Sequence, residues 1–431
     1  MFPAQPAPAT ERAWAELTEP LLEDLCVGMT NIPSPPGAEL PLAQWCAGRM
    51  SSEGIEASVQ LVHHTQANAV ATMQSGVPGP ELLLYSPIDT HLSGEPERDL
   101  PWAGLAEDGE LAPLARRQGD HVVGLGANNP KGHAAAVMAA AIAIARAGVR
   151  VPGVLRVGLG AGGMPTNPET GFAAGSQIGH GSGCRHLLEQ GGVPDAAVIA
   201  KSGDAVAWEE PGLVWFRVSV SGRLSYAGLR GSGAQRNPIV ASARVIGALE
   251  KWLDHYADEN EQGLIRPQGA ISAVRGGWSH KLAFTPAACH LYLDLRIVPG
   301  VSAAAAERQL RAGLEGIRRE LDDQGFALTV ERLLSIPGSR TDPSAPIIRR
   351  TITAWELVSG RSHQPIERTS GATDANILRA WGVPTARVGM ARVSEDCGIR
   401  DDFARAMNVC SITGMARLAR ILVATALEDP T

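Results

Sequence analysis

The sequence lacks the features that mark several classes of protein. Its 431 residues carry a formal net charge of −7, so there is no basic excess to bind nucleic acid or anionic lipid. The longest apolar stretch, "HAAAVMAAAIAIARAG", is rich in alanine and too short to span a bilayer. The first residues, "MFPAQPAPATERAW", contain no apolar segment typical of a secretion signal. We therefore expect neither nucleic acid nor a membrane among the partners.

Cysteine is scarce as well. The six cysteines form no C-x-x-C pair and are too few for a disulfide-stapled scaffold in a chain of this length. Such cysteines are typical of reduced thiols, which predicts a cytoplasmic protein. They are Cys26, Cys46, Cys184, Cys289, Cys397 and Cys410.

What is present is a chain long enough for two or three domains, in which predicted helices and strands alternate. The stretch "TERAWAELTEPLLEDLCVGMTNI", residues 10–32, reads as a helix. At Gly212 the pattern changes to β-α-β-β-α-β, the split βαβ unit, and α/β character returns after it. We predict an α/β domain with a mostly parallel sheet, formed by residues 1–211 and 335–431 and interrupted by an inserted domain at 212–334.

One strand places polar residues where open α/β sheets carry out their chemistry. The stretch "ELLLYSPIDTHLSG", residues 81–94, begins as a buried strand and breaks at Ser86-Pro87. Asp89 and His91 follow just past its carboxyl end. Ligands of open α/β sheets bind at this edge, so these two residues are candidates for the active site.

Five motifs in order resemble the di-zinc aminoacylase, succinyl-diaminopimelate desuccinylase and glutamate carboxypeptidase family. They are "LLLYSPIDT", "GLGANNPKGHAAAVMAA", "VSVSGRLSYAG", "LYLDLRIVPG" and "TSGATDANILRAWGVPTARVG". The resemblance spans nearly the whole chain. It implies an aminoacylase-like layered catalytic domain plus an inserted ferredoxin-like lid and dimerisation domain, through which two copies form a homodimer.

The family's zinc ligands are replaced in this sequence. By the resemblance, Pro87 stands at the first histidine and Asn129 at the bridging aspartate. The Glu-Glu pair falls near Ala161, Gly162 and Gly163, the next carboxylate near Lys201, and the last histidine near Cys397. Zinc takes N, S and O donors, which most of these residues lack. We therefore expect no cofactor.

A rebuilt centre for zinc or another divalent metal is the alternative. Its ligands would be Asp89, His91, His133 and Glu169, the last within the glycine-rich stretch 158–183. This stretch has no phosphate-binding pattern, and we interpret it as an active-site loop that replaced the Glu-Glu segment.

Five residues are candidates for catalysis without a metal. The Lys201 ammonium, placed in the former metal cavity against Asp89, would polarise a carbonyl. His91 or His133 would serve as general acid or base, and Cys397 as a nucleophile. Each also has a structural interpretation: Asp89 as a cap of backbone amides, Lys201 as a salt-bridge partner, the histidines as surface or capping groups, and Cys397 as a small buried residue.

Four further residues are candidates for substrate binding: Asn129, Tyr226, Arg275 and Asp374. Tyr226 stands where the family has a histidine in the insert, and Asp374 matches the family's late Asp-Ala element. Arg275 is a cation suited to a carboxylate on the substrate.

These observations predict a hydrolase that cleaves an amide or related non-ester C–N bond of a small polar substrate, without the di-zinc centre. The first alternative is an inactive family member that binds a small ligand or a partner protein. The second is a metal-dependent amidohydrolase or peptidase.

Overall fold

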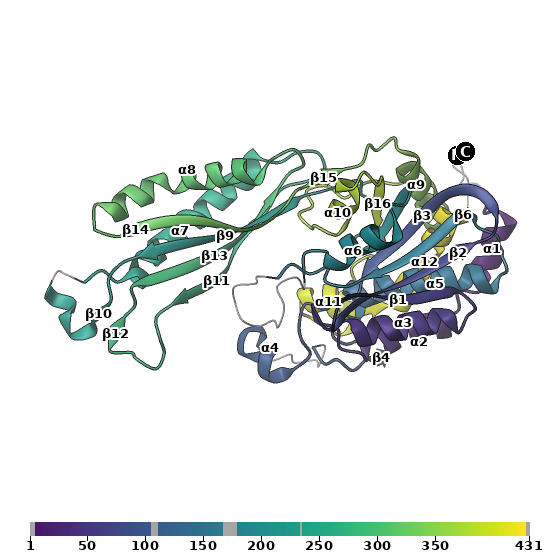
Figure 1. Ribbon diagram of the computed structural model, residues 1–431, viewed down its shortest axis with the longest axis horizontal. Coiled ribbons are helices and arrows are strands. Elements are labelled where there is room, and N and C mark those ends of the chain that lie inside the picture. The colour runs from purple at the N-terminus through teal and green to yellow at the C-terminus, as the bar shows by residue number, and fades with distance from the viewer. Residues whose placement is uncertain (1–4, 105–110, 167–178, 233–234, 428–431) are drawn as a thin grey trace. The chain divides into compact units, whose positions relative to one another are not determined.

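The computed structural model describes residues 5–104, 111–166, 179–232 and 235–427, and Figure 1 shows its helices and strands. The chain divides into two compact units. The first contains Met1–Trp208, Thr341–Ile366 and Thr373–Thr431. The second contains Glu209–Arg340 and Glu367–Ala372, and so includes the predicted insert with short flanking segments.

The first unit is built on a six-stranded mixed sheet. Its strand order is β1 (Glu56–His63), β2 (Gln66–Gln74), β6 (Pro152–Gly160), β3 (Val77–Pro87), β7 (Ala196–Ala200) and β16 (Thr385–Val388). From β6 to β16 the neighbours are parallel, whereas β1 and β2 pair antiparallel. The α/β fold class is confirmed, and the parallel part carries the strand ends that matter for the site.

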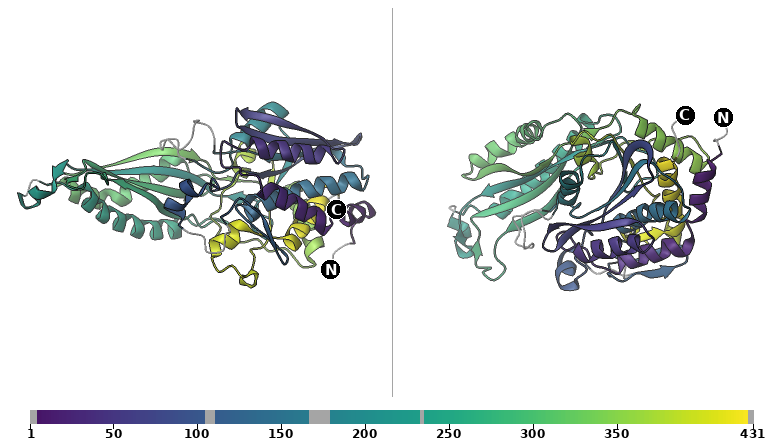
Figure 2. Two further views of the ribbon diagram at one scale, coloured as in Figure 1. Left: turned by 90° about the horizontal axis from the view of Figure 1, so that it is seen from below. Right: turned by 45° about the vertical axis from the view of Figure 1, so that its right-hand side comes forward.

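Helices cover both faces of this sheet. Successive side chains of a strand point to opposite faces, and in β3 both sets are apolar and buried. Leu82 and Leu84 of β3 join the core under α1 (Pro8–Ala15), α2 (Glu19–Thr30), α3 (Leu40–Ser51), α5 (His133–Arg146), α9 (Pro346–Ser359) and α12 (Ile412–Leu427). Leu83 and Tyr85 face α6 (Ser182–Gly191) and α10 (Ala375–Ala380). In Figure 2 the helices α2, α5 and α12 lie side by side.

The stretch predicted as one helix at residues 10–32 is two helices, α1 and α2, and the prediction is wrong at this point. The chain leaves helical structure between Ala15 and Glu19. Pro20 lies in the first turn of α2, where its missing N–H costs nothing, whereas inside a continuous helix it would remove a hydrogen bond.

Short elements of the first unit complete the surroundings of the strand ends. They are α4 (Pro96–Ala103), β4 (Arg116–Gln118), β5 (His121–Val123), η1 (Ala127–Gly132), η4 (Glu395–Cys397), α11 (Asp402–Asn408) and β17 (Val409–Ser411). The strands β17, β5 and β4 form a three-stranded sheet in that order. In the described part of the chain, no helix has both the length and the apolar character needed to cross a bilayer.

The second unit has the split βαβ order. Its elements are β9 (Gly212–Ser221), α7 (Pro238–Glu259), β11 (Gly269–Gly276), β13 (Ala288–Ile297), α8 (Ala303–Asp322) and β14 (Ala327–Ile336). The sheet order is β11-β13-β9-β14, with antiparallel neighbours and β11 at one edge. The period-two pattern of β9 buries Val214, Phe216, Val218 and Val220 in one core with α7 and α8. The second unit also contains two short two-stranded sheets. They are formed by β10 (Ser225–Tyr226) with β12 (Phe284–Thr285), and by β8 (Glu209–Glu210) with β15 (Ser339–Arg340).

Candidate active site

The candidate residues of the first unit follow the carboxyl ends of its parallel strands. Asp89 and His91 come after β3, Gly162 and Gly163 after β6, and Lys201 directly after β7. Because parallel strands end at the same edge of a sheet, these segments lie together. The Lys201 N–H donates to the Val388 carbonyl at 3.1 Å and ties the end of β7 to the end of β16.

Asp89 is fully buried and binds the segment that follows β6. Its Oδ1 accepts the N–H of Gly163 and its Oδ2 accepts the N–H of Met164, both at 2.7 Å. Burial raises the pKa of Asp89, while these backbone hydrogen bonds and the Lys201 charge oppose that rise. A carboxylate whose two oxygens each accept an amide N–H is a strong local clamp. In the structure, Asp89 therefore holds the backbone at residues 163 and 164.

Glu39 completes this clamp and is the site residue that the sequence analysis missed. Its Oε1 accepts the N–H of Gly162 at 2.8 Å, and its Oε2 accepts the N–H of Gly37 at 3.0 Å. Burial, and then the nearby Asp89, raise the pKa of Glu39 to about 8. The available signal was an acidic residue directly before α3, which is common at the start of a helix and does not reveal a contact with residue 162.

Asp374 and Asp89 both approach Gly163. A methyl group on Gly163 would lie 3.1 Å from Asp89 Oδ1, 3.3 Å from Asp374 Oδ2 and 2.7 Å from Pro87 Cβ. The Tyr85 hydroxyl donates to Asp374 Oδ2 at 2.7 Å. Burial raises the pKa of Asp374 to about 6, with the Asp89 charge adding to the rise and the Tyr85 hydrogen bond and the Lys201 charge opposing it. Asp374 is therefore partly protonated near neutral pH.

The positive charge of Lys201 acts on four titratable side chains of the site. Burial is the first cause of the pKa shift at Asp89, Asp374, His91 and His133, and the Lys201 charge contributes to each. It favours the charged form of the two carboxyl groups and the neutral form of the two histidines. The structure thus brings four of the predicted site residues within reach of the charge of a fifth, Lys201.

His133 links two segments of the site through both of its ring nitrogens. Nδ1 is paired with the Asn128 carbonyl at 2.8 Å, so it carries the hydrogen, and Nε2 accepts the N–H of Met390 at 3.3 Å. The pKa of His133 is lowered to about 3, chiefly by burial; the hydrogen bond to Asn128 opposes the shift, and the Lys201 and Arg387 charges contribute to it. A role as general base requires the Nε2 bond to open.

His91 has a different environment. Its ring meets the Phe403 ring edge-on, with 5.3 Å between the centroids. Burial lowers the pKa of His91 to about 4, against the opposing charge of Asp99. With this lowered pKa the imidazole is uncharged at neutral pH, and its ring nitrogens form no hydrogen bond within the described ranges.

Asn129 lies in η1 and contacts α11. Its Nδ2 donates to the sulfur of Met407 at 3.3 Å. Its Oδ1 is buried and has no partner within the described ranges. The neighbouring Lys131 is buried too, and its Nζ donates to the Ile32 carbonyl at 2.7 Å, so this side chain serves the fold.

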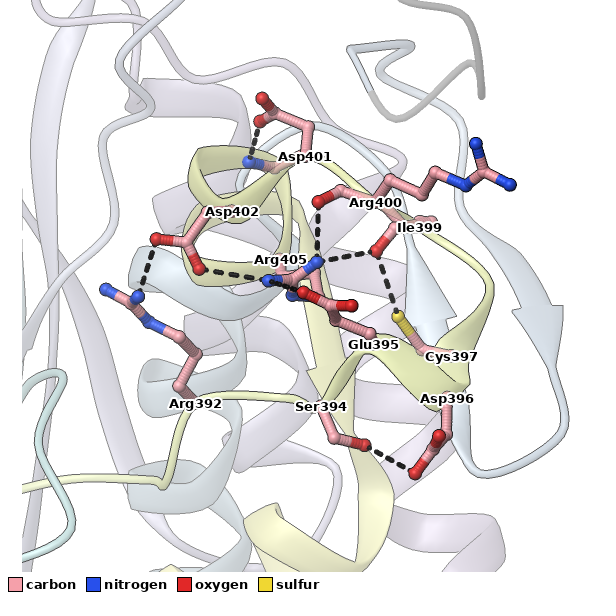
Figure 3. A network of polar contacts seen from close by, with 11 residues as sticks. Arg392, Ser394, Glu395, Asp396, Cys397, Ile399, Arg400, Asp401, Asp402 and Arg405 are labelled. Carbon is pink, nitrogen blue, oxygen red and sulfur yellow. Dashed lines mark hydrogen bonds and ion pairs between the residues drawn. The ribbon is translucent and has the colours of Figure 1, made fainter.

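Cys397 lies in a small apolar cluster with Val123, Val393, Ile399, Ala404 and Val409. Its thiol contacts the Ile399 carbonyl at 3.9 Å (Figure 3). The buried Arg405 guanidinium holds the same segment, donating to the carbonyls of Ile399 at 2.9 Å and Arg400 at 2.6 Å and pairing with Asp402 at 3.0 Å. The predicted nucleophile is thus buried in an apolar cluster, and its catalytic role stays a prediction.

Tyr226 and Arg275 belong to the second unit. The Tyr226 side chain, in β10, is 52% exposed and its ring is tilted against that of Phe284. Arg275 is exposed on the edge strand β11, opposite His290 of β13. Their predicted contact with substrate stays a prediction.

The residues present do not fit the dinuclear metal centre that the resemblance implies. Pro87, Gly162 and Gly163 have no side-chain donor, and the carboxylate oxygens of Asp89 accept amide N–H groups. Over the described ranges, no group of three or more His, Cys, Asp and Glu side chains is arranged to hold a metal ion. For the alternative rebuilt centre, both nitrogens of His133 are engaged and Glu169 lies outside the described residues.

The chain is similar to peptidases of known structure. Residues 209–320 match the family described as the M20 peptidase dimerisation domain. Human carnosine dipeptidase 1 is similar with a TM-score of 0.71 and 14% identity, over 98% of this chain and 99% of that one. The di-peptidase Dug1p of Saccharomyces cerevisiae gives 0.69 and 13%, over 97% and 98%. The Bacillus subtilis YXEP protein, a dinuclear metal binding peptidase of the M20 family, gives 0.60 and 15%, over 95% and 97%. These similarities show the fold.

Proposed function

We propose that this protein is a hydrolase that cleaves an amide or related non-ester C–N bond of a small polar substrate, and that it does so without a di-zinc centre. The similarity of its fold to dipeptidases supports the reaction class. The observation that carries the metal-free part is the ammonium of Lys201, whose charge acts on Asp89, Asp374 and His91 at the sheet edge.

In the proposed reaction, Lys201 polarises the substrate carbonyl and stabilises the oxyanion that forms when water attacks it. Asp374, with a pKa of about 6, takes the proton from the attacking water and returns it to the leaving nitrogen. The C–O bond then forms, the C–N bond breaks, and a carboxylic acid and an amine leave. Asp89 and Glu39 hold the backbone at residues 162–164 throughout.

We propose secondary roles for the remaining predicted residues. His91 is a second acid or base, and His133 becomes one if its bond to Met390 opens. Cys397 is an alternative nucleophile. Asn129, Tyr226 and Arg275 are proposed substrate contacts, with Arg275 directed to a carboxylate of the substrate. The free cysteines support a cytoplasmic location, because all six are buried and unpaired.

We further propose that the protein is a homodimer formed through the second unit. The match to a dimerisation domain supports this, as does the number of large apolar side chains that the unit exposes. They are Leu224, Tyr226, Leu229, Ile239, Val240, Val274, Trp278, Leu282 and Phe284.

The test is hydrolysis of a panel of dipeptides and N-acyl amino acids by protein treated with a chelator, with metal content measured on the same sample. We expect turnover that survives metal removal, is lost in Lys201→Met and is retained in Lys281→Met, a control lysine of the second unit. Activity that appears only after zinc, manganese or cobalt is added would favour the metal-dependent alternative. Binding of a panel compound without turnover would favour the non-catalytic alternative.

A further inference from the structure

Three buried polar atoms of the first unit have no hydrogen-bond partner among the described residues and belong to one neighbourhood. They are Nδ1 and Nε2 of His91 and Oδ1 of Asn129. An unpaired buried polar atom destabilises a fold, and such atoms are rare in native proteins. Their presence at two residues beside the proposed active site calls for a ligand that pairs with them.

The two side chains are placed along one face of α11. His91 packs against the ring of Phe403, and Asn129 contacts the sulfur of Met407. Phe403 and Met407 are four residues apart in this helix, so they lie on the same face. A thioether sulfur accepts a hydrogen but has none to donate, so the amide nitrogen of Asn129 is the atom that faces Met407. Its Oδ1 is therefore free for another partner.

The backbone brings the two segments close together. A methyl group on Gly126, at the start of the turn that carries Asn129, would lie 2.6 Å from Thr90 Cγ2 and 3.7 Å from the Asn129 carbonyl oxygen. Thr90 directly precedes His91. The charge of Lys201 also reaches His91, which joins this neighbourhood to the proposed catalytic lysine.

We propose that His91 and Asn129 form a subsite that binds a primary carboxamide or ureido group of the substrate. The inference deepens the proposed function, on which it rests for the assignment of the ligand as a substrate. A neutral imidazole offers one donor and one acceptor, and Asn129 Oδ1 offers an acceptor. The NH2 of a carboxamide donates to Asn129 Oδ1, and its carbonyl accepts from the imidazole N–H; the second ring nitrogen points to the opposite edge of the ring and takes no part in this pairing.

Other small polar groups complement these atoms less well. A carboxylate places an oxygen against Asn129 Oδ1, where both atoms accept and neither donates. An ammonium donates to Asn129 Oδ1 but leaves the imidazole N–H without a partner. The neighbouring Lys201 charge also disfavours a cation here.

The test uses the full-length protein and three probes of matched chain length: propionamide, propionate and propylammonium. Saturation-transfer NMR measures their binding, and thermal unfolding measures stability. We expect propionamide to bind best, and His91→Phe and Asn129→Leu each to weaken it by about tenfold, the loss of one hydrogen bond. We also expect both variants to unfold at a higher temperature than the parent, because each removes an unpaired buried polar group.

His363→Phe is the matched control. His363 also meets an aromatic ring edge-on, that of Trp355, but its Nε2 accepts the N–H of Val206 at 2.8 Å. This variant should unfold at a lower temperature and keep propionamide binding. The proposal is overturned if propionate or propylammonium binds better than propionamide, or if neither site variant weakens propionamide. If propionamide binds as described but no panel substrate is hydrolysed, the subsite proposal is supported and the proposed hydrolase function is contradicted.

Discussion

Tyr85 donates its hydroxyl hydrogen to Asp374 at 2.7 Å, although the two residues are 289 positions apart in the chain. Tyr85 is in the middle sheet strand β3 and Asp374 directly precedes α10. Both are buried, so the hydrogen bond is shielded from water and strengthens the ionised form of Asp374. Burial raises the pKa of Asp374, the group that we propose as acid and base, and this hydrogen bond opposes that rise.

Tyr85→Phe should raise the pKa of Asp374 further above its usual range, because the Tyr85 hydrogen bond holds that pKa down against burial. The acid limb of the pH–rate profile should move to higher pH. The free energy of unfolding should fall by about 1–3 kcal/mol, the value of a hydrogen bond to a charged group. A pH–rate profile measures the first effect, and denaturant unfolding measures the second. An unchanged acid limb would remove Asp374 from the proposed proton transfer.

Glu39→Gln should flatten the pH dependence of stability between about pH 4.5 and 8. Burial raises the pKa of Glu39 to about 8, so this group favours the folded state fully only below its unfolded pKa, and that contribution is lost as the pH rises through the folded pKa. At pH 5 the variant should be the less stable protein, because a glutamine amide has one oxygen for the N–H groups of Gly162 and Gly37, and this difference should narrow at pH 9 by an amount on the order of 1–3 kcal/mol. Urea unfolding at pH 5 and pH 9 compares the two. A variant that loses stability equally at both values would contradict the buried, protonated state of Glu39.

Asp89→Asn should release the segment after β6. An asparagine amide has one oxygen, so it can accept the N–H of Gly163 or of Met164 but not both. We expect a loss of about 2–4 kcal/mol and faster hydrogen exchange at both amides.

Asp99→Asn is the matched control for this change. Asp99 is also buried and accepts the N–H groups of Ser93 and Gly94, at 3.1 and 2.8 Å. Its variant should lose comparable stability while the exchange of Gly163 and Met164 stays unchanged. Equal exchange in the two variants would show a general loosening rather than release of one clamp.

Trp278→Glu should weaken the proposed dimer. Trp278 is 63% exposed in the second unit, within the set of exposed apolar side chains there. A buried charge at an interface is costly, so the dissociation constant should rise by about tenfold or more. Light scattering during gel filtration measures the mass, and Trp381→Glu, at an exposed tryptophan of the first unit, is the control. A monomeric parent protein would contradict the proposal directly.

Much of the fold could be predicted from local pattern. The buried run of β3, the period-two alternation of β9 and the order β-α-β-β-α-β all reflect which side chains face a core, and that periodicity is visible along the chain. The break between α1 and α2 was also encoded locally, by Pro20, although one long helix was predicted there. The position of Asp89 just past a strand end followed from the same reasoning, whereas Lys201 was placed by the family resemblance.

The sequence by itself determined the layered α/β domain with its insert and the polar residues at the strand ends. The tertiary structure alone decided what those residues contact. Asp89 meets the amides of residues 163 and 164, Glu39 meets that of residue 162, and His133 meets that of Met390. These partners are between 74 and 257 positions apart, so no local periodicity encodes them, and only the packed backbone selects which buried acceptor satisfies which amide.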